Sequence, residues 1–318
     1  MDDYSSFHKK LHSWYGKHGR KDLPWRNTDD AYAIYVSEVM LQQTQVKTVL
    51  ERYYFQFLKR FPTLKALAKA KEQDVLSAWQ GLGYYSRARN LYKAAKACGG
   101  QLPRDVDALI ALPGIGRNTA HAVASFAYHQ PVAVMEANVK RVLCRIFALE
   151  SPTDAELWNN ATALLDIRNP FDYNQAMMDI GAQVCSKRNP KCSKCPAETI
   201  CAGQSTPEQF PAKKLKKVVP VRQKIIVIKQ NGKGEYFATP RTTQFLNGLY
   251  HFEEHPLPPD VGGVYLGAIR QQYSHFTLEA NVYRLRVAKS SGKGWYSLAK
   301  LKKLPFSMAE KKILEMLS

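Results

Sequence analysis

The stretch ALPGIGRNTAHAVASFAYHQPVAVMEANVKRVLCRI, residues 111–146, decides the fold of the first half of the chain. It opens on the turn LPGIG at 112–116, where two glycines flank an isoleucine. Such a pair suits a tight turn that bulkier residues could not make. Apolar residues at helical spacing precede the turn and follow it. The pattern predicts a helix–hairpin–helix.

The second helix of this hairpin is expected to begin directly after Gly116. Its free backbone N–H groups and the positive end of its dipole would face out of the turn, ready for a phosphate. Glu136 stands further along, just before a third apolar stripe, so one segment would supply a phosphate grip and a carboxylate. An ordinary helical turn with a surface acid fits the turn sequence equally well.

Composition indicates a polyanionic partner. The 318 residues suffice for two domains, and 46 Lys and Arg against 27 Asp and Glu give a net charge of +19. Nucleic acid is the first candidate and an anionic membrane surface the second. No apolar run approaches a membrane span, and the acidic N-terminus lacks a signal core. We therefore expect a cytoplasmic monomer with no membrane partner and with reduced thiols.

A long helix is expected over residues 30–60, and it carries the run SEVMLQQTQ at 37–45. Glu38 lies among apolar neighbours, where desolvation should raise its pKa into the range of a general acid. A helix-surface glutamate is the commoner alternative. The glutamines from Gln42 onward suit base edges, or else a solvated face.

Two further stretches carry possible nucleic-acid contacts. The loop GLGYYSRAR at 81–89 combines glycines, tyrosines and arginines, a mixture that favours nucleic acid over a membrane, although core tyrosines also fit it. The polar and aromatic tip QQYSHF at 271–276 precedes an expected strand. Its Ser-His pair alone is weak evidence for any function.

Four cysteines form the pattern C-x6-C-x2-C-x5-C: Cys185, Cys192, Cys195 and Cys201. Disulfides are improbable without a secretory context, so the thiolates are candidate ligands of zinc or of a [4Fe–4S] cluster. Zinc sites usually combine two short C-x2-C pairs, and this pattern contains only one. The unequal loops favour the cluster.

The domain organisation follows from a change in composition. Residues 1–202 read as helical and residues 203–221 as a basic, proline-containing linker. Strands are expected at 224–228, 236–238 and 281–287, and a closing helix at 307–317. The fold class is thus a mainly α N-terminal domain followed by an α+β domain at 222–318.

Residues 20–202 resemble the helix–hairpin–helix DNA glycosylase superfamily, chiefly through LPGIGRNTA and the cysteine spacing. Within it the chain is similar to the adenine DNA glycosylase (MutY) family, through SEVMLQQTQV, GLGYYSRARN and Asn118, which replaces the lysine nucleophile of lyase-type members. The resemblance implies a Nudix-like C-terminal domain that reads 8-oxoguanine. It also implies monofunctional removal of adenine mispaired with 8-oxoguanine or guanine in double-stranded DNA, and a [4Fe–4S] cofactor.

The resemblance also implies roles for individual residues. The catalytic set is Glu38, Glu136 and Asn138, with Glu38 protonating the flipped adenine and the second carboxylate stabilising the sugar cation. Lys140, four residues after Glu136, favours the ionised form of that second carboxylate and lies near the sugar. The substrate and DNA contacts would come from Trp25, Arg26, Gln42, Tyr84, Gly114, Gly116, Asn118, Lys140, Gln175, Tyr273, Ser274 and His275.

Glu136 departs from the family pattern Asp-Gly-Asn-Val, because this chain reads Glu-Ala-Asn-Val at 136–139. Glutamate caps helices less well than aspartate, so Asn138 is expected to set the helix start. Three explanations are open: a retracted backbone that restores the reach of Glu136, a slowed enzyme, or a lesion binder that barely cuts. A further alternative is an endonuclease III-like glycosylase/lyase, against which Asn118 and the second domain argue.

Overall fold

The computed structural model describes residues 4–213, 218–243, 245–255, 263–288 and 292–317. The chain divides into two compact units, Met1–Lys69 with Asn90–Leu215 and Ala70–Arg89 with Lys216–Ser318. The second unit thus includes a piece of the N-terminal half. The domain boundaries expected at 202 and 222 stay a prediction, and residues 214–217 of the expected linker lie outside the described residues.

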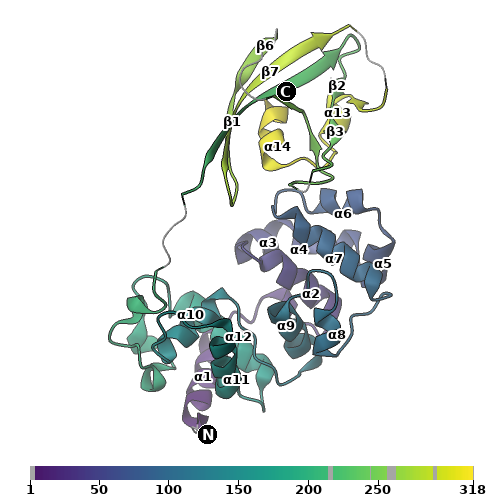
Figure 1. The fold of residues 1–318 in the computed structure, drawn as a ribbon. Coiled ribbons are helices and arrows are strands. Elements are labelled where there is room, and N and C mark those ends of the chain that lie inside the picture. Colours follow the sequence, from purple (N-terminus) through teal and green to yellow (C-terminus); the bar gives the residue numbers. More distant parts are fainter. Residues whose placement is uncertain (1–3, 214–217, 244, 256–262, 289–291, 318) are drawn as a thin grey trace. The chain divides into compact units, whose positions relative to one another are not determined.

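The first unit is helical (Figure 1). Its elements are α1 Ser5–His18, η1 Pro24–Arg26, α2 Ala31–Leu41, α3 Val46–Arg52, α4 Tyr54–Arg60, α5 Leu64–Lys69, the greater part of α7 Tyr85–Ala97, α8 Val106–Ile110, α9 Arg117–Tyr128, α10 Ala137–Ile146, α11 Asp154–Leu164, α12 Pro170–Gln183, η2 Cys192–Lys194, η3 Glu198–Ile200 and η4 Pro207–Gln209.

The expected helix–hairpin–helix is confirmed by α8, the turn at 111–116 and α9. Gly114 has φ +74°, in the left-handed region that favours glycine. A Cβ at Gly114 would also lie 2.3 Å from the Cβ of Asn90, so the turn sits tightly against α7. Both the conformation and the close approach therefore require glycine at this position.

The single helix expected over residues 30–60 is wrong. These residues, all of which the structure describes, form α2, α3 and α4 instead. The break falls on the polar run after Leu41, which offers no apolar side chain to anchor a continuous helix, and Gln43 adopts a left-handed φ of +57°. Glu38 consequently lies in the last turn of a short helix.

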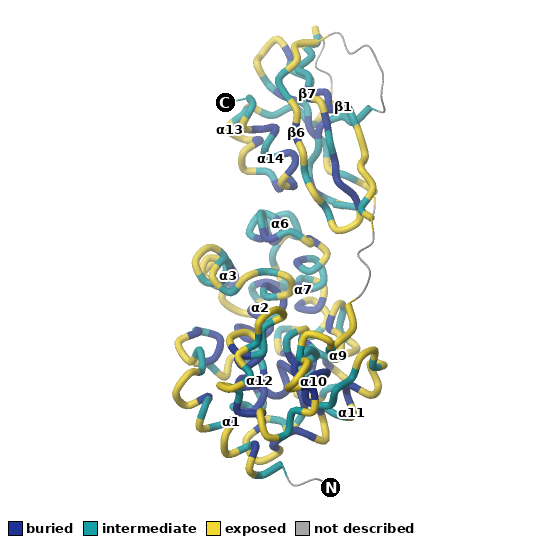
Figure 2. The backbone as a smooth tube through the Cα atoms, turned by 90° about the vertical axis from the view of Figure 1, so that its left-hand side faces the viewer, coloured by how far each residue is buried: buried dark blue, intermediate teal, exposed yellow. Residues whose placement is uncertain are grey.

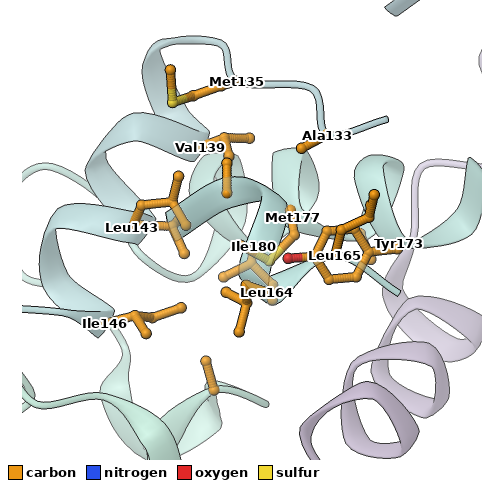
Figure 3. Packing of buried hydrophobic residues seen from close by; sticks show 14 of the residues in the cluster. Ala133, Met135, Val139, Leu143, Ile146, Leu164, Leu165, Tyr173, Met177 and Ile180 are labelled. Carbon is orange, nitrogen blue, oxygen red and sulfur yellow. The ribbon is translucent and has the colours of Figure 1, made fainter. Parts of the chain in front are cut away.

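The core that supports α10 draws its side chains from four helices, α1, α10, α11 and α12. Figure 3 shows Leu143 and Ile146 of α10 packing toward Met177 and Ile180 of α12. The backbones of these two helices approach closely, because a Cβ at Gly181 would lie 2.6 Å from the Cβ of Asn138. The start of α10 is therefore held against a buried helix (Figure 2).

The second unit is a mixed sheet with helices, as expected for an α+β domain. Its elements are α6 Glu72–Ala78, the first turn of α7, β1 Val221–Asn231, β2 Tyr236–Phe237, β3 Thr239–Pro240, β4 Tyr250–His251, β5 Glu253–His255, β6 Val264–Gln272, β7 Thr277–Val287, β8 Trp295–Tyr296, α13 Leu298–Leu301 and α14 Met308–Glu315. The main sheet has the order β6-β7-β1-β2-β8, with β5 also pairing with β1.

Strands β1 and β7 are parallel neighbours at the centre of this sheet, and β6 and β7 form an antiparallel hairpin. Helix α14 packs Ala309, Ile313 and Leu314 into the same core as Ile226 and Ile228 of β1. The expected strands and the closing helix are thereby confirmed. No helix among the described residues is long and apolar enough to cross a membrane.

Candidate active site

Two carboxyl groups of the first unit lie close enough for their charges to interact. Glu38 comes from the last turn of α2, and Glu136 stands at the start of α10. Burial and, to a lesser extent, the negative charge of Glu136 raise the pKa of Glu38, the Arg26 guanidinium opposes the rise, and the resulting value is about 7. The acid form of Glu38 is thus available near neutral pH, as the sequence predicts.

Glu136 is the N-cap of α10, so the expectation that Asn138 sets the helix start is wrong. The Glu136 carboxylate accepts the backbone N–H of Asn138 at 2.8 Å and that of Val139 at 3.2 Å. It does so by folding back over its own helix end, which absorbs the extra methylene. Asn138 lies inside the first turn and donates its side-chain amide to Glu136 at 3.2 Å.

Asn138 and Arg141 connect this carboxylate to the first cysteine of the predicted cluster. The Arg141 guanidinium donates to Asn138 Oδ1 at 2.9 Å and to the backbone carbonyl of Cys185 at 2.9 Å. Lys140, which was expected to favour the ionised form of Glu136, instead forms an ion pair with Asp154 at 2.8 Å.

A buried ion triad fixes Arg26. Asp179 of α12 has no exposed surface and accepts two hydrogen bonds from Arg26, at 2.7 and 2.9 Å, and one from Arg20 Nε at 2.7 Å. Burial alone would raise the pKa of Asp179, but hydrogen bonds and charges from Arg26 and Arg20 lower it. Sequence reasoning missed Asp179, because its partner Arg26 lies 153 residues away along the chain.

The remaining candidates of the first unit lie on neighbouring elements. Gln42 ends α2 and donates to the Thr119 hydroxyl of α9 at 3.4 Å. Trp25 is buried, with its ring 5.1 Å from that of Tyr54 in an edge-on contact. Gln175 is buried on α12, and the glycines of the hairpin, Gly114 and Gly116, are exposed.

The four cysteines of the predicted cluster line one cavity, together with Arg145. Arg145 is buried, and its guanidinium donates to Cys185 Sγ at 3.2 Å and to the Ser186 carbonyl at 2.7 Å. Burial raises the pKa of the Cys195 thiol to about 12. Within the described ranges, no three His, Cys, Asp or Glu side chains converge closely enough to hold a single metal ion.

Comparison with known proteins agrees with this geometry. Residues 36–165 match the model of the HhH-GPD superfamily of base excision DNA repair proteins. An adenine DNA glycosylase of Buchnera aphidicola (subspecies Acyrthosiphon pisum) is 34% identical, over 97% of this chain and 97% of that protein. The chain belongs to the adenine DNA glycosylase family.

Two further relatives fit this assignment. The human adenine DNA glycosylase is 43% identical over 65% of this chain, which spans only 41% of the human protein. A thermostable thymine-DNA glycosylase of known structure is 29% identical, covers 63% of this chain and 96% of its own, and has a TM-score of 0.58. The expectation of a DNA glycosylase is confirmed.

The other candidates of this glycosylase lie in the second unit. Tyr84 has φ +47° and is 48% exposed, with the Arg87 guanidinium 5.4 Å from its ring centre. Tyr273, Ser274 and His275 form the turn between β6 and β7. The Ser274 hydroxyl lies 3.2 Å from His275 Nδ1, and both residues are exposed, whereas Tyr273 is half-buried.

The raised pKa of Glu38 makes stability depend on pH. The folded value of about 7 exceeds the ordinary 4.5, so the folded state binds the proton more tightly, and this contribution is lost as pH rises from 4.5 through 7. Glu38→Gln removes the ionisation. We expect the free energy of unfolding of the variant, relative to the parent, to increase from pH 5.5 to pH 8.5. Each unit of pKa shift that the substitution removes is worth about 1.4 kcal/mol.

Urea unfolding at the two pH values measures this difference. Glu156→Gln, on an exposed position of α11, is the matched control, and its difference from the parent should change little. A Glu38→Gln difference that does not vary with pH would show that Glu38 is not held in a desolvating site.

Proposed function

We propose that this protein hydrolyses the N-glycosidic bond of adenine in DNA, using Glu38 as general acid and Glu136 as the stabilising carboxylate. The observation that carries the proposal is the contrast between the two groups. Burial favours the protonated form of Glu38. Each of the three hydrogen bonds to Glu136 comes from an N–H donor, an arrangement that suits a carboxylate anion.

The reaction needs the adenine outside the stack, because its ring nitrogens are inaccessible within a duplex. Glu38 donates its proton to the flipped base, and the glycosidic electron pair leaves with the adenine. The sugar becomes an oxocarbenium-like cation, which the Glu136 carboxylate stabilises. Water then adds to C1′ and gives a proton back to the Glu38 carboxylate, so the products are free adenine and an abasic site.

Asn118 and Lys140 argue for a monofunctional enzyme rather than an endonuclease III-like lyase. The hairpin position of the lyase nucleophile holds Asn118, which has no amine. Lys140, the nearby lysine, is engaged with Asp154. A non-catalytic lesion binder remains the alternative from another class, and Glu136 is its only support.

Duplex DNA would bind at the hairpin. Gly114 and Gly116 are exposed and lead into α9, whose first N–H groups and positive dipole end suit a phosphate. The charge of +19 supplies the wider attraction for the backbone. We propose that the protein acts as a monomer on adenine mispaired with 8-oxoguanine or guanine.

A [4Fe–4S] cluster fits the four cysteines, which line one cavity beside a buried arginine. Cys185, Cys192, Cys195 and Cys201 would hold it. The cluster would supply the positive charge that turns thiols with pKa values raised by burial into thiolate ligands. Arg145 and Arg141 then keep the loop around Cys185 in place through its carbonyl oxygen.

Recognition of 8-oxoguanine would come from the second unit. Tyr84 offers an exposed ring for stacking, and the Ser274–His275 turn offers hydrogen-bonding groups at the tip of a hairpin. The family resemblance implies that residues 222–318 are a Nudix-like reader domain, and these residues carry no hydrolase signature. The exposed turn packs against Phe245, whose ring centre lies 5.1 Å from that of His275.

The catalytic proposal is tested at Glu136. In single-turnover assays on an A:8-oxoguanine duplex, the parent releases adenine, and Glu136→Gln loses on the order of a hundredfold or more in rate, because a neutral amide cannot stabilise the cation. Glu136→Asp keeps the charge and the capping bonds, so its rate stays within about tenfold of the parent.

No adenine release by the parent or by Glu136→Asp would refute the enzyme and leave the lesion binder. A gain above about a hundredfold in Glu136→Asp would show instead that the longer side chain misplaces the carboxylate.

The reader proposal is tested at His275. His275→Ala should lower the ratio of adenine excision from A:8-oxoguanine to excision from A:G by roughly tenfold, the value of one or two polar contacts. Val264→Ala, an exposed change on β6, is the control and keeps the parental ratio. Equal losses on both duplexes in His275→Ala would contradict a reading role.

A further inference from the structure

The segment that delivers Glu136 has no regular secondary structure, yet the three residues directly before Glu136 are buried. Residues 129–136 connect α9 to α10, and Ala133, Val134 and Met135 are 4%, 2% and 1% exposed. Backbone groups in such a place need partners, since an unsatisfied buried donor or acceptor costs about 1–3 kcal/mol. No strand pairs with this segment among the described residues.

Side chains of α9 and α12 provide those partners. Asn174 of α12 accepts the N–H of Val134 at 2.9 Å and donates to the carbonyl of Val132 at 2.9 Å. His121 of α9 has Nδ1 2.8 Å from the carbonyl of Ala133. A carbonyl oxygen can only accept, so the His121 Nδ1 donates, and burial lowers the pKa of this ring.

The last of these contacts belongs to Asn118. Its Oδ1 accepts the N–H of Met135 at 2.8 Å, directly before Glu136. Asn118 also stands in the first turn of α9, immediately after the hairpin glycines. Figure 3 shows Met135 and Ala133 on the chain that leads into α10. One hydrogen bond therefore joins the first turn of α9 to the residue directly before Glu136.

We propose that Asn118 is a positioning residue for base excision, whose bond to the Met135 N–H fixes the backbone that carries Glu136. This inference rests on the proposed function. The Glu136 side chain folds back onto its own helix end, so the place of its carboxylate follows the backbone at 135–136. A hairpin lysine could not take this role, because an ammonium group has no acceptor for the Met135 N–H.

The two variants that separate this role from a merely structural one are Asn118→Ala and Asn118→Asp. Alanine removes the acceptor. Aspartate keeps an acceptor oxygen at the same reach but adds a negative charge beside the proposed phosphate site. Asn159→Ala, at an exposed position on α11, is the matched control.

The measurements are the single-turnover rate of adenine release at saturating protein, the Kd for a duplex with a non-hydrolysable adenine analogue, and amide exchange of the peptide containing 133–136. Asn118→Ala should lose about ten- to a hundredfold in rate, with the Kd changed by about twofold or less, and exchange faster at 135. Asn118→Asp should weaken the Kd yet keep parental exchange and a rate within about fivefold.

A parental rate in Asn118→Ala, or an equal loss of rate in both variants, would overturn the proposal. Failure of the unsubstituted protein to release adenine would refute the proposed function instead. The exchange data then still decide the anchor: faster exchange in Asn118→Ala alone supports it, and unchanged exchange in that variant refutes it.

Discussion

The desolvation of one carboxyl beside the charge of another is the interaction on which the rest of the site depends. Glu38 keeps its proton near neutral pH because burial and Glu136 both disfavour its anion. Glu136 is surrounded by N–H donors from its own helix end. Two chemically identical side chains are thereby held in different environments, which is the condition for the acid-assisted cleavage of a glycosidic bond that we propose.

The acid form of Glu38 persists only if the positive charge of the nearby Arg26 is neutralised. Arg26 opposes the protonation of Glu38, and an unpaired buried guanidinium would do so strongly. Asp179 neutralises it with two hydrogen bonds, and Arg20 completes the triad. Asp179, on the buried face of α12, therefore acts on Glu38 only through Arg26, and Gly181 brings the same helix close to the start of α10.

The features that were predictable from the sequence are those with local signatures. The glycines predict the hairpin, the spacing of the cysteines predicts a shared ligand site, and the apolar neighbours of Glu38 on one helix predict its raised pKa. The break after Leu41 was missed because helical periodicity resumes beyond it. Glutamate has a low propensity for the N-cap position, so the capping role of Glu136 was not expected. Tertiary packing of α10 against α12 fixes the start of this helix. Asp179 and Asn118 act through contacts distant in sequence, with partners 153 residues and 17 residues away, and no local pattern encodes such pairs.

The titration of the Glu38 carboxyl can be followed directly by carbon-13 NMR of the protein labelled at glutamate side chains, with Glu38→Gln used to assign the Glu38 signal. The two-carboxylate site predicts that the Glu38 signal titrates with a midpoint near 7 and that Glu136→Gln lowers this midpoint. A Glu38 signal that titrates near 4.5, with or without Glu136, would contradict it.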